Sequence, residues 1–193
     1  MARVPLTGHD SAVLDAPPGP APRTAVPLAL ATLAGLAVGG LTLVMQGTLP
    51  GVLNHLGNSG AVWSLAAFGA GALLPVRGWR AAVSGAVLLV GAVLGYYGST
   101  TVFLHDDVNS GTLLGPAVWA TVALVAGPVF GLAGAAYRGD RPGYRWAALG
   151  ALGAVFVAEA LYLGGALSQW GEAGLMAGLG LLLALLLGTR VLR

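Results

Sequence analysis

The stretch Ala25–Gln46, AVPLALATLAGLAVGGLTLVMQ, decides the fold class because it is apolar almost throughout and carries no charged residue. In an α-helix, which rises about 1.5 Å per residue, a stretch of this length crosses the roughly 30 Å hydrocarbon core of a bilayer. A cleaved signal peptide would have a shorter apolar core of about 7–15 residues, closer to the start of the chain. The stretch therefore predicts a membrane helix that stays in the protein.

The composition of the whole chain also points to lipid as the solvent. Hydrophobic residues make up 56% of the 193 residues and charged residues 8%, whereas soluble domains have roughly 25% charged residues. The net charge is +2, but the nine basic residues are all arginines, separated by apolar runs, and this pattern argues against nucleic acid as a partner. The absence of cysteine excludes disulfides and cysteine metal sites.

Five further apolar runs follow the first, and they predict an all-α bundle of about six transmembrane helices over residues 25–193. The predicted ranges are 25–46, 59–76, 81–104, 112–136, 146–167 and 174–188. Residues 1–24 contain five prolines among small and polar residues, and this composition predicts a disordered cytoplasmic tail. Pro128 lies inside the fourth run, where a kink is expected.

The arginines occupy the tail, every second loop and the C-terminal end of the chain. They are Arg3 and Arg23, then Arg77 and Arg80, then Arg138, Arg141 and Arg145, then Arg190 and Arg193. Arginine is enriched in cytoplasmic loops, so this pattern predicts that both termini are cytoplasmic. We expect a bacterial inner-membrane protein with the lipid bilayer as its partner. An odd number of spans would place the arginines on two faces.

Small residues four positions apart recur in the apolar runs. They are Ala31, Gly35 and Gly39, Gly91 and Gly95, Gly127 and Gly131, and Gly174 and Gly178. This spacing lets helix backbones approach closely. With 32 glycines in the chain many such pairs arise by chance, so the spacing predicts a tightly packed bundle rather than any named interface. A homo-oligomer and a membrane partner subunit both stay open.

An internal similarity links Ala61-Val62-Trp63 to Ala117-Val118-Trp119. Each motif is followed by an arginine-bearing loop and then by a run that opens with two alanines, and in this register Tyr96 corresponds to Tyr162. Two interpretations remain: a duplicated helical hairpin of the kind many transporters carry, or chance similarity in a chain rich in alanine and glycine.

Glu159 is the most unusual residue of the apolar runs. Counted from Trp146, it lies about 20 Å into the membrane, and an ionised carboxylate there costs on the order of 3 kcal/mol or more. It should therefore face the bundle, pair with a donor or be protonated. Tyr162 shares its helical face and is predicted to donate a hydrogen bond to it. Tyr96 and Trp63 are expected at a similar depth.

Two functions are compatible with Glu159, Tyr162, Tyr96 and Trp63 at these positions. The first is the binding or transport of a small polar solute or cation in an outward-facing cavity around Glu159. The alternative is a non-catalytic structural or accessory subunit of a membrane complex, in which Glu159 bonds to a neighbouring helix and the aromatic residues form an interfacial belt.

No catalytic constellation or cofactor motif is recognisable, so we do not expect an enzyme or a cofactor. The segment His105-Asp106-Asp107 suggests metal ligands, but adjacent residues do not readily converge on one ion. We interpret this segment as a solvated loop and predict no metal site.

Several short motifs together resemble a family of actinobacterial multipass membrane proteins that is classed only as a domain of unknown function. The motifs are Asn58-Ser59-Gly60-Ala61-Val62-Trp63, Gly95-Tyr96-Tyr97, Gly127-Pro128-Val129-Phe130-Gly131 and Ala158-Glu159-Ala160-Leu161-Tyr162. The resemblance covers about residues 25–193 and implies no activity or ligand. In gross form the chain is also similar to the substrate-binding component of energy-coupling-factor vitamin transporters. That likeness implies that small residues of the first helix, such as Ala31 and Gly35, contact a coupling subunit.

Overall fold

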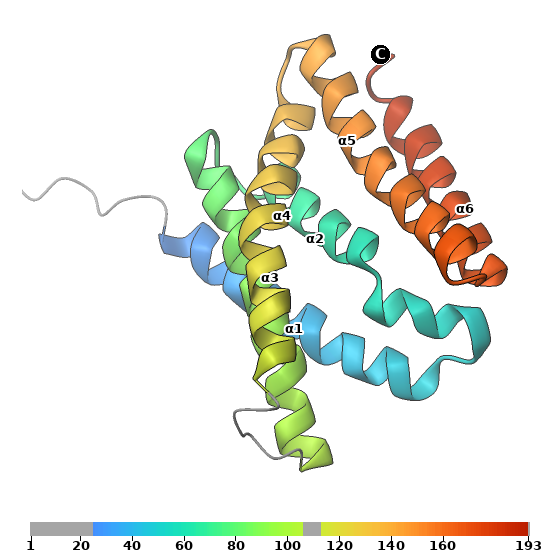
Figure 1. Ribbon diagram of the computed structural model, residues 1–193. Helices are drawn as coiled ribbons and strands as arrows, with labels where there is room; N and C mark the ends of the chain where they lie inside the picture. The colour runs from blue at the N-terminus through green and yellow to red at the C-terminus, as the bar shows by residue number, and fades with distance from the viewer. Residues whose placement is uncertain (1–24, 106–112, 193) are drawn as a thin grey trace, which may run out of the picture.

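The computed structural model describes residues 25–105 and 113–192, which form helices and no strands (Figure 1). The α-helices are α1 (Ala25–Thr48), α2 (Gly60–Leu73), α3 (Trp79–Ser99), α4 (Leu114–Arg138), α5 (Pro142–Leu161) and α6 (Trp170–Gly188). The predicted all-α bundle is confirmed. The tail predicted for residues 1–24 and the loop residues Asp106 and Asp107 lie outside the described residues.

Three short helical segments complete the chain. The 3-10 helix η2 (Gly51–Asn58) joins α1 to α2, and the π-helical turns η3 (Thr100–Leu104) and η4 (Tyr162–Ala166) extend α3 and α5. Among the described residues, five helical stretches are long and apolar enough to cross a membrane, namely α1, α3 with η3, α4, α5 with η4, and α6. The chain is therefore an integral membrane protein.

Helix α2 is shorter than predicted. It has 14 residues and covers about 21 Å, less than the hydrocarbon thickness. The predicted range 59–76 is wrong at its C-terminal end, because α2 stops at Leu73 and Leu74 has an extended backbone. The cause is Pro75, since a proline disfavours the helical conformation of the residue before it.

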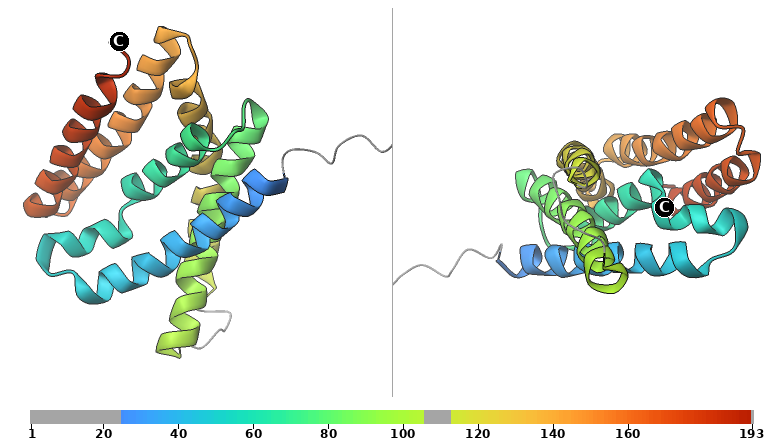
Figure 2. Two further views of the ribbon diagram at one scale, coloured as in Figure 1. Left: turned by 180° about the vertical axis from the view of Figure 1, so that it is seen from behind. Right: turned by 60° about the horizontal axis from the view of Figure 1, so that its bottom comes forward.

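Helix α2 also begins inside the bundle rather than at its end. Helix α1 crosses the molecule obliquely, η2 turns back, and α2 starts part of the way along (Figures 1 and 2). Helices α3, α4 and α5 pack against α2, and its residues Ala61, Ala67 and Phe68 are buried. Protein therefore replaces lipid around much of this short helix.

Glycine brings the first four helices into backbone contact. A Cβ atom at Gly39 of α1 would overlap the Ala92 carbonyl of α3, and one at Gly85 of α3 would overlap the Gly127 carbonyl of α4. Helix α1 consequently crosses α3, and α3 runs beside α4, without intervening side chains (Figure 2). The predicted tight bundle thus follows from direct contact of helix backbones.

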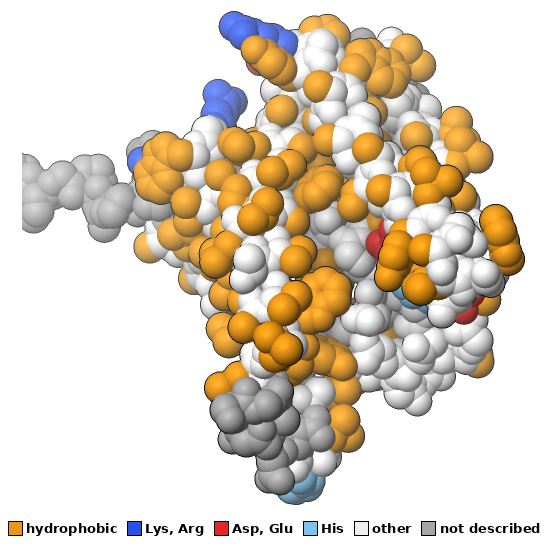
Figure 3. Space-filling model, in the orientation of Figure 1, with side chains coloured by type: hydrophobic (Ala, Val, Ile, Leu, Met, Phe, Trp, Pro, Cys, Tyr) orange, Lys and Arg blue, Asp and Glu red, His pale blue; other side chains and the backbone are white. Residues whose placement is uncertain are grey.

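The described arginines gather at one end of the bundle. Arg77, Arg138 and Arg141 line one cavity there, and Arg138, Arg145 and Arg190 line a second. Figure 3 shows basic side chains at this end and apolar side chains over the flank of the molecule that faces the viewer. We call this end the arginine end. Its position on the cytoplasmic side of the membrane stays a prediction.

Candidate functional site

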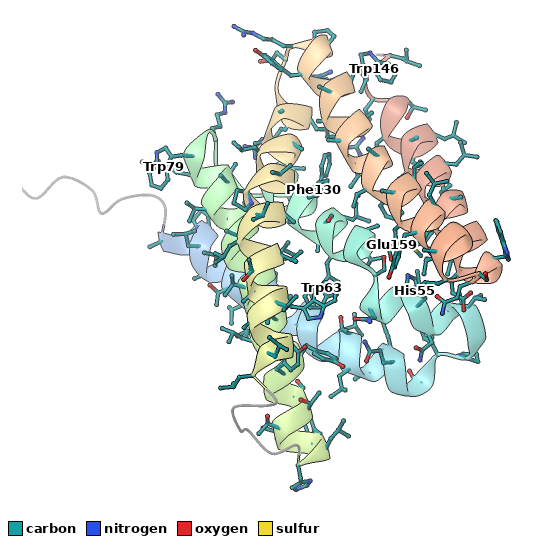
Figure 4. All side chains as sticks on the ribbon, in the orientation of Figure 1. His55, Trp63, Trp79, Phe130, Trp146 and Glu159 are labelled. Carbon is teal, nitrogen blue, oxygen red and sulfur yellow. The ribbon has the colours of Figure 1, made fainter. Side chains whose placement is uncertain are left out.

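Glu159 and His55 form a close pair between α5 and η2 (Figure 4). His55 Nε2 lies 2.6 Å from Glu159 Oε1, and the backbone N–H of Ala61 donates to Glu159 Oε2 at 2.7 Å. The two side chains are 19% and 14% exposed. Both oxygens of the carboxylate therefore have partners within the chain.

One partner of Glu159, the Ala61 N–H, belongs to the first turn of α2. The first N–H groups of a helix lack intrahelical acceptors, and the helix dipole makes this end favourable for negative charge. Ser59 caps the same turn, accepting a hydrogen bond from the Val62 N–H at 3.1 Å, and its hydroxyl donates to Met176 Sδ of α6 at 3.4 Å. Glu159 thus supplies a hydrogen-bond acceptor at the start of α2.

A pocket of about 180 Å³ lies beside this turn, and we call it the aromatic pocket. Its walls come from four helices and from the residues that precede α2. They are Thr42, Asn58, Ser59, Gly60, Trp63, Tyr96, Tyr97 and Trp119. Glu159 is not among them, but a Cβ atom at Gly60 would lie 3.8 Å from Glu159 Oε2. The carboxylate therefore sits directly behind the Gly60 wall.

Four aromatic rings dominate the pocket. The ring centroids of Trp63 and Trp119 are 6.1 Å apart, and those of Tyr96 and Tyr97 are 5.0 Å apart with the rings edge to face. The Tyr96 hydroxyl donates to Gln46 Oε1 at 3.0 Å. The Trp63 indole N–H is buried and has no hydrogen-bond partner in the described part of the chain. An unpaired buried donor costs about 1–3 kcal/mol.

The model of a family of unknown function, DUF6518, matches residues 18–193. The chain belongs to this family. No curated protein and no solved structure matches the chain. The match confirms the predicted resemblance to a domain of unknown function, whereas the actinobacterial source and the likeness to vitamin transporter components stay predictions.

In this DUF6518 protein the four predicted site residues lie in three places. Trp63 and Tyr96 come together in the aromatic pocket, and Glu159 lies behind its wall. Tyr162 is 59% exposed, and the oxygens of Glu159 are bonded to His55 and Ala61 instead. The backbone between Glu159 and Tyr162 is α-helical, with the Tyr162 N–H bonded to the Ala158 carbonyl, but the predicted Tyr162 bond is not formed because the ring lies on the exposed side.

Three residues of the pocket and the site were not among the predicted site residues. His55 lies 104 positions before Glu159, and nothing in the sequence brings the two residues together. Trp119 did leave a signal, because the repeated Ala-Val-Trp motif places Trp63 and Trp119 at corresponding positions, and these two rings meet. Tyr97 was noted only as a neighbour of Tyr96.

The site carries no sign of metal binding. Residues 25–105 and 113–192 contain no group of three His, Asp or Glu side chains arranged to hold an ion. The aromatic pocket presents aromatic faces, hydroxyl groups and one unpaired N–H donor beside a helix N-terminus.

Proposed function

We propose that this DUF6518 protein binds a small polar solute in the aromatic pocket between α1, α2, α3 and α4. The observation that carries the proposal is the buried, unpaired indole N–H of Trp63, which borders this pocket. Buried donors in proteins nearly always have a partner, so this N–H is suited to an acceptor on a molecule in the pocket.

The walls favour a compact organic cation that also carries an acceptor. Trp63, Trp119, Tyr96 and Tyr97 present aromatic rings, which attract quaternary ammonium groups by about 0.5–2 kcal/mol each. The Trp63 N–H would take a carboxylate or hydroxyl of the same molecule. The volume of about 180 Å³ equals that of about six waters, which suits a betaine-like solute.

Glu159 supports this site without touching the solute. It holds the first turn of α2 through the Ala61 N–H and holds η2 through His55. Asn58, Ser59 and Gly60 connect these two elements and form one wall of the pocket. Glu159 is therefore a positioning residue in this proposal.

The test compares Trp63→Phe with Trp170→Phe in the purified full chain, with glycine betaine, choline and glycerol as probes. Wild type and Trp170→Phe should be stabilised against heat by betaine or choline and not by glycerol. Trp63→Phe should bind about tenfold more weakly, because one hydrogen bond is lost. Equal binding by Trp63→Phe, or no effect of either quaternary ammonium probe on wild type, would reject the proposal.

Transport of the bound solute is the stronger form of the proposal. It predicts uptake of the same probe into vesicles that contain the wild-type chain, and reduced uptake with Trp63→Phe.

A structural or accessory role is the second candidate, and one observation favours it. Both oxygens of Glu159 are bonded within the chain, as expected of a group that joins helices. This role predicts that Trp63→Phe is at least as stable as wild type, that no probe binds, and that a partner subunit or a second copy purifies with the chain.

A further inference from the structure

A second site lies at the arginine end, separate from the aromatic pocket. A groove of about 490 Å³ runs between α2 and α6, and we call it the α2–α6 groove. Its apolar walls include Leu65 and Phe68 of α2 and Leu183 and Leu187 of α6, and its rim carries Arg138, Arg145 and Arg190. The groove thus has an apolar interior and a basic rim.

The groove exists because α6 packs against α5 while the short α2 packs against α3, α4 and α5. Tyr137 reaches across one end, donating its hydroxyl to the Leu187 carbonyl at 2.9 Å, and its ring lies against Phe68 with centroids 5.6 Å apart. Gly69 lines the groove, and a Cβ atom there would meet nothing within 4 Å. Space therefore remains along the α2 wall.

Two of the rim arginines are held in place by backbone carbonyls. The Arg138 guanidinium donates to the carbonyls of Leu74 and Val76 just beyond α2. Arg145 Nε donates to the Gly139 carbonyl at 2.6 Å. A guanidinium has five N–H donors, so Arg138 keeps three and Arg145 keeps four. Fixed side chains lose little entropy when a ligand binds.

The charged side chains at the rim are all basic. Among the described residues no acidic side chain lines the groove: Asp140 borders the neighbouring cavity at the arginine end. Glu159 and Glu172 belong to the ends of α5 and α6 that are remote from this rim. Three guanidinium groups over an apolar groove match a molecule with an anionic head and a hydrocarbon tail.

We propose that the α2–α6 groove binds an anionic phospholipid, with an acyl chain against Leu65, Phe68 and Leu183 and the phosphate at Arg145 and Arg190. The bilayer around the protein supplies such a molecule directly. Basic pockets between membrane helices are suited to anionic head groups, and arginine binds phosphate through paired N–H donors. The bound lipid would join α2 to α6 where protein contacts are sparse.

The test uses the full chain purified in an uncharged detergent and two lipids with the same acyl chains, phosphatidylglycerol and phosphatidylcholine. Native mass spectrometry measures bound lipid, and thermal unfolding measures stabilisation. Phosphatidylglycerol should bind and stabilise, and Arg145→Gln with Arg190→Gln should weaken its binding about thirtyfold. The control Arg80→Gln removes an arginine of the same end that does not line the groove and should bind like wild type.

Gly69→Leu tests the apolar part without touching the charges. The leucine side chain fills open space in the groove, so the variant should fold but no longer bind phosphatidylglycerol. The control Gly150→Leu, on the exposed side of α5 with nothing within 4 Å, should bind this lipid like wild type.

Three results would overturn the proposal. The first is equal stabilisation by the two lipids, and the second is equal weakening by Arg80→Gln, which would mean diffuse surface charge. The third is full stabilisation by glycerol phosphate alone, which would mean a free phosphate site.

Discussion

Helices α1 to α4 and the hairpin of α5 and α6 use glycine in different ways. Among helices α1 to α4, backbone lies against backbone: a side chain at Gly39, Gly85 or Gly134 would overlap a carbonyl of the neighbouring helix. In the hairpin, Gly174 and Gly178 have nothing within 4 Å. There the contact is made by large side chains, such as Phe156 of α5 and Met176 of α6, which are 1% and 0% exposed.

The difference shows what small-residue spacing can and cannot predict. Gly127 and Gly131 of α4 have the same spacing as Gly174 and Gly178 of α6, yet only the first pair lies against another helix. The spacing permits close approach of two backbones without determining where it happens. Polar side chains add links between the two parts, with Glu159 bonded to the start of α2 and Tyr137 bonded to Leu187.

Among the substitutions that test this difference, Gly85→Leu should have the largest effect on folding. The added side chain would overlap the Gly127 carbonyl, so α3 and α4 are forced apart and no monodisperse folded protein is expected in fluorescence-detected size-exclusion chromatography. Gly178→Leu is the matched control and should elute like wild type. If both variants behave alike, the backbone contact between α3 and α4 does not hold the fold.

Glu159→Ala should have the next largest effect, because it removes a link between the hairpin and the start of α2. His55 and the Ala61 N–H would be left partly buried without their partner, and breaking a buried pair of this kind costs about 3 kcal/mol. Thermal unfolding measures the loss. In a double-mutant cycle, His55→Ala should add little once Glu159 is replaced. Fully additive losses would mean that the two side chains do not interact.

Tyr137→Phe should destabilise the protein by about 1 kcal/mol. The ring and its contact with Phe68 are kept, while the hydroxyl that bonds to the Leu187 carbonyl is removed. Tyr144→Phe, with an exposed ring at the same end, is the control and should unfold at the wild-type temperature. Equal melting temperatures for the two variants would show that the link to α6 contributes nothing measurable.

Gly178→Ala should have the smallest effect, and it should raise the stability where the other substitutions lower it. The methyl group meets no neighbour, and alanine in a helix is favoured over glycine by about 0.5–1 kcal/mol. A small rise in melting temperature is expected. A fall would indicate that this face of α6 packs against a second copy or a partner subunit, since crowding would then offset the gain.

Much of the fold could be predicted from the sequence because hydropathy reports directly on membrane spans. Five of the six predicted runs contain helices long enough to cross a membrane, and the described arginines lie together at one end. The burial pattern within each helix could not be predicted. In a lipid environment the outward and inward faces are both apolar, so Leu33 at 63% exposed and Leu89 at 3% look alike in the sequence.

The site was only partly predictable for a related physical reason. Glu159 could be singled out because an unpartnered carboxylate in an apolar run is costly. Its partner could not, because the contact with His55 depends on η2 folding back and on α2 starting inside the bundle. The same geometry brings Trp119 to Trp63 and leaves Tyr162 outside.

The short α2 has a consequence for the order of assembly during synthesis. A 14-residue helix is below the length that a translocon readily recognises as a membrane span, and it emerges about a hundred residues before Glu159, which completes its first turn. We therefore expect α2 to settle last, after α5 has entered the bilayer. Helix α2 would then take its place in the bundle only after the other helices have been inserted. In a nascent chain stopped before α5, α2 would not reach its final position.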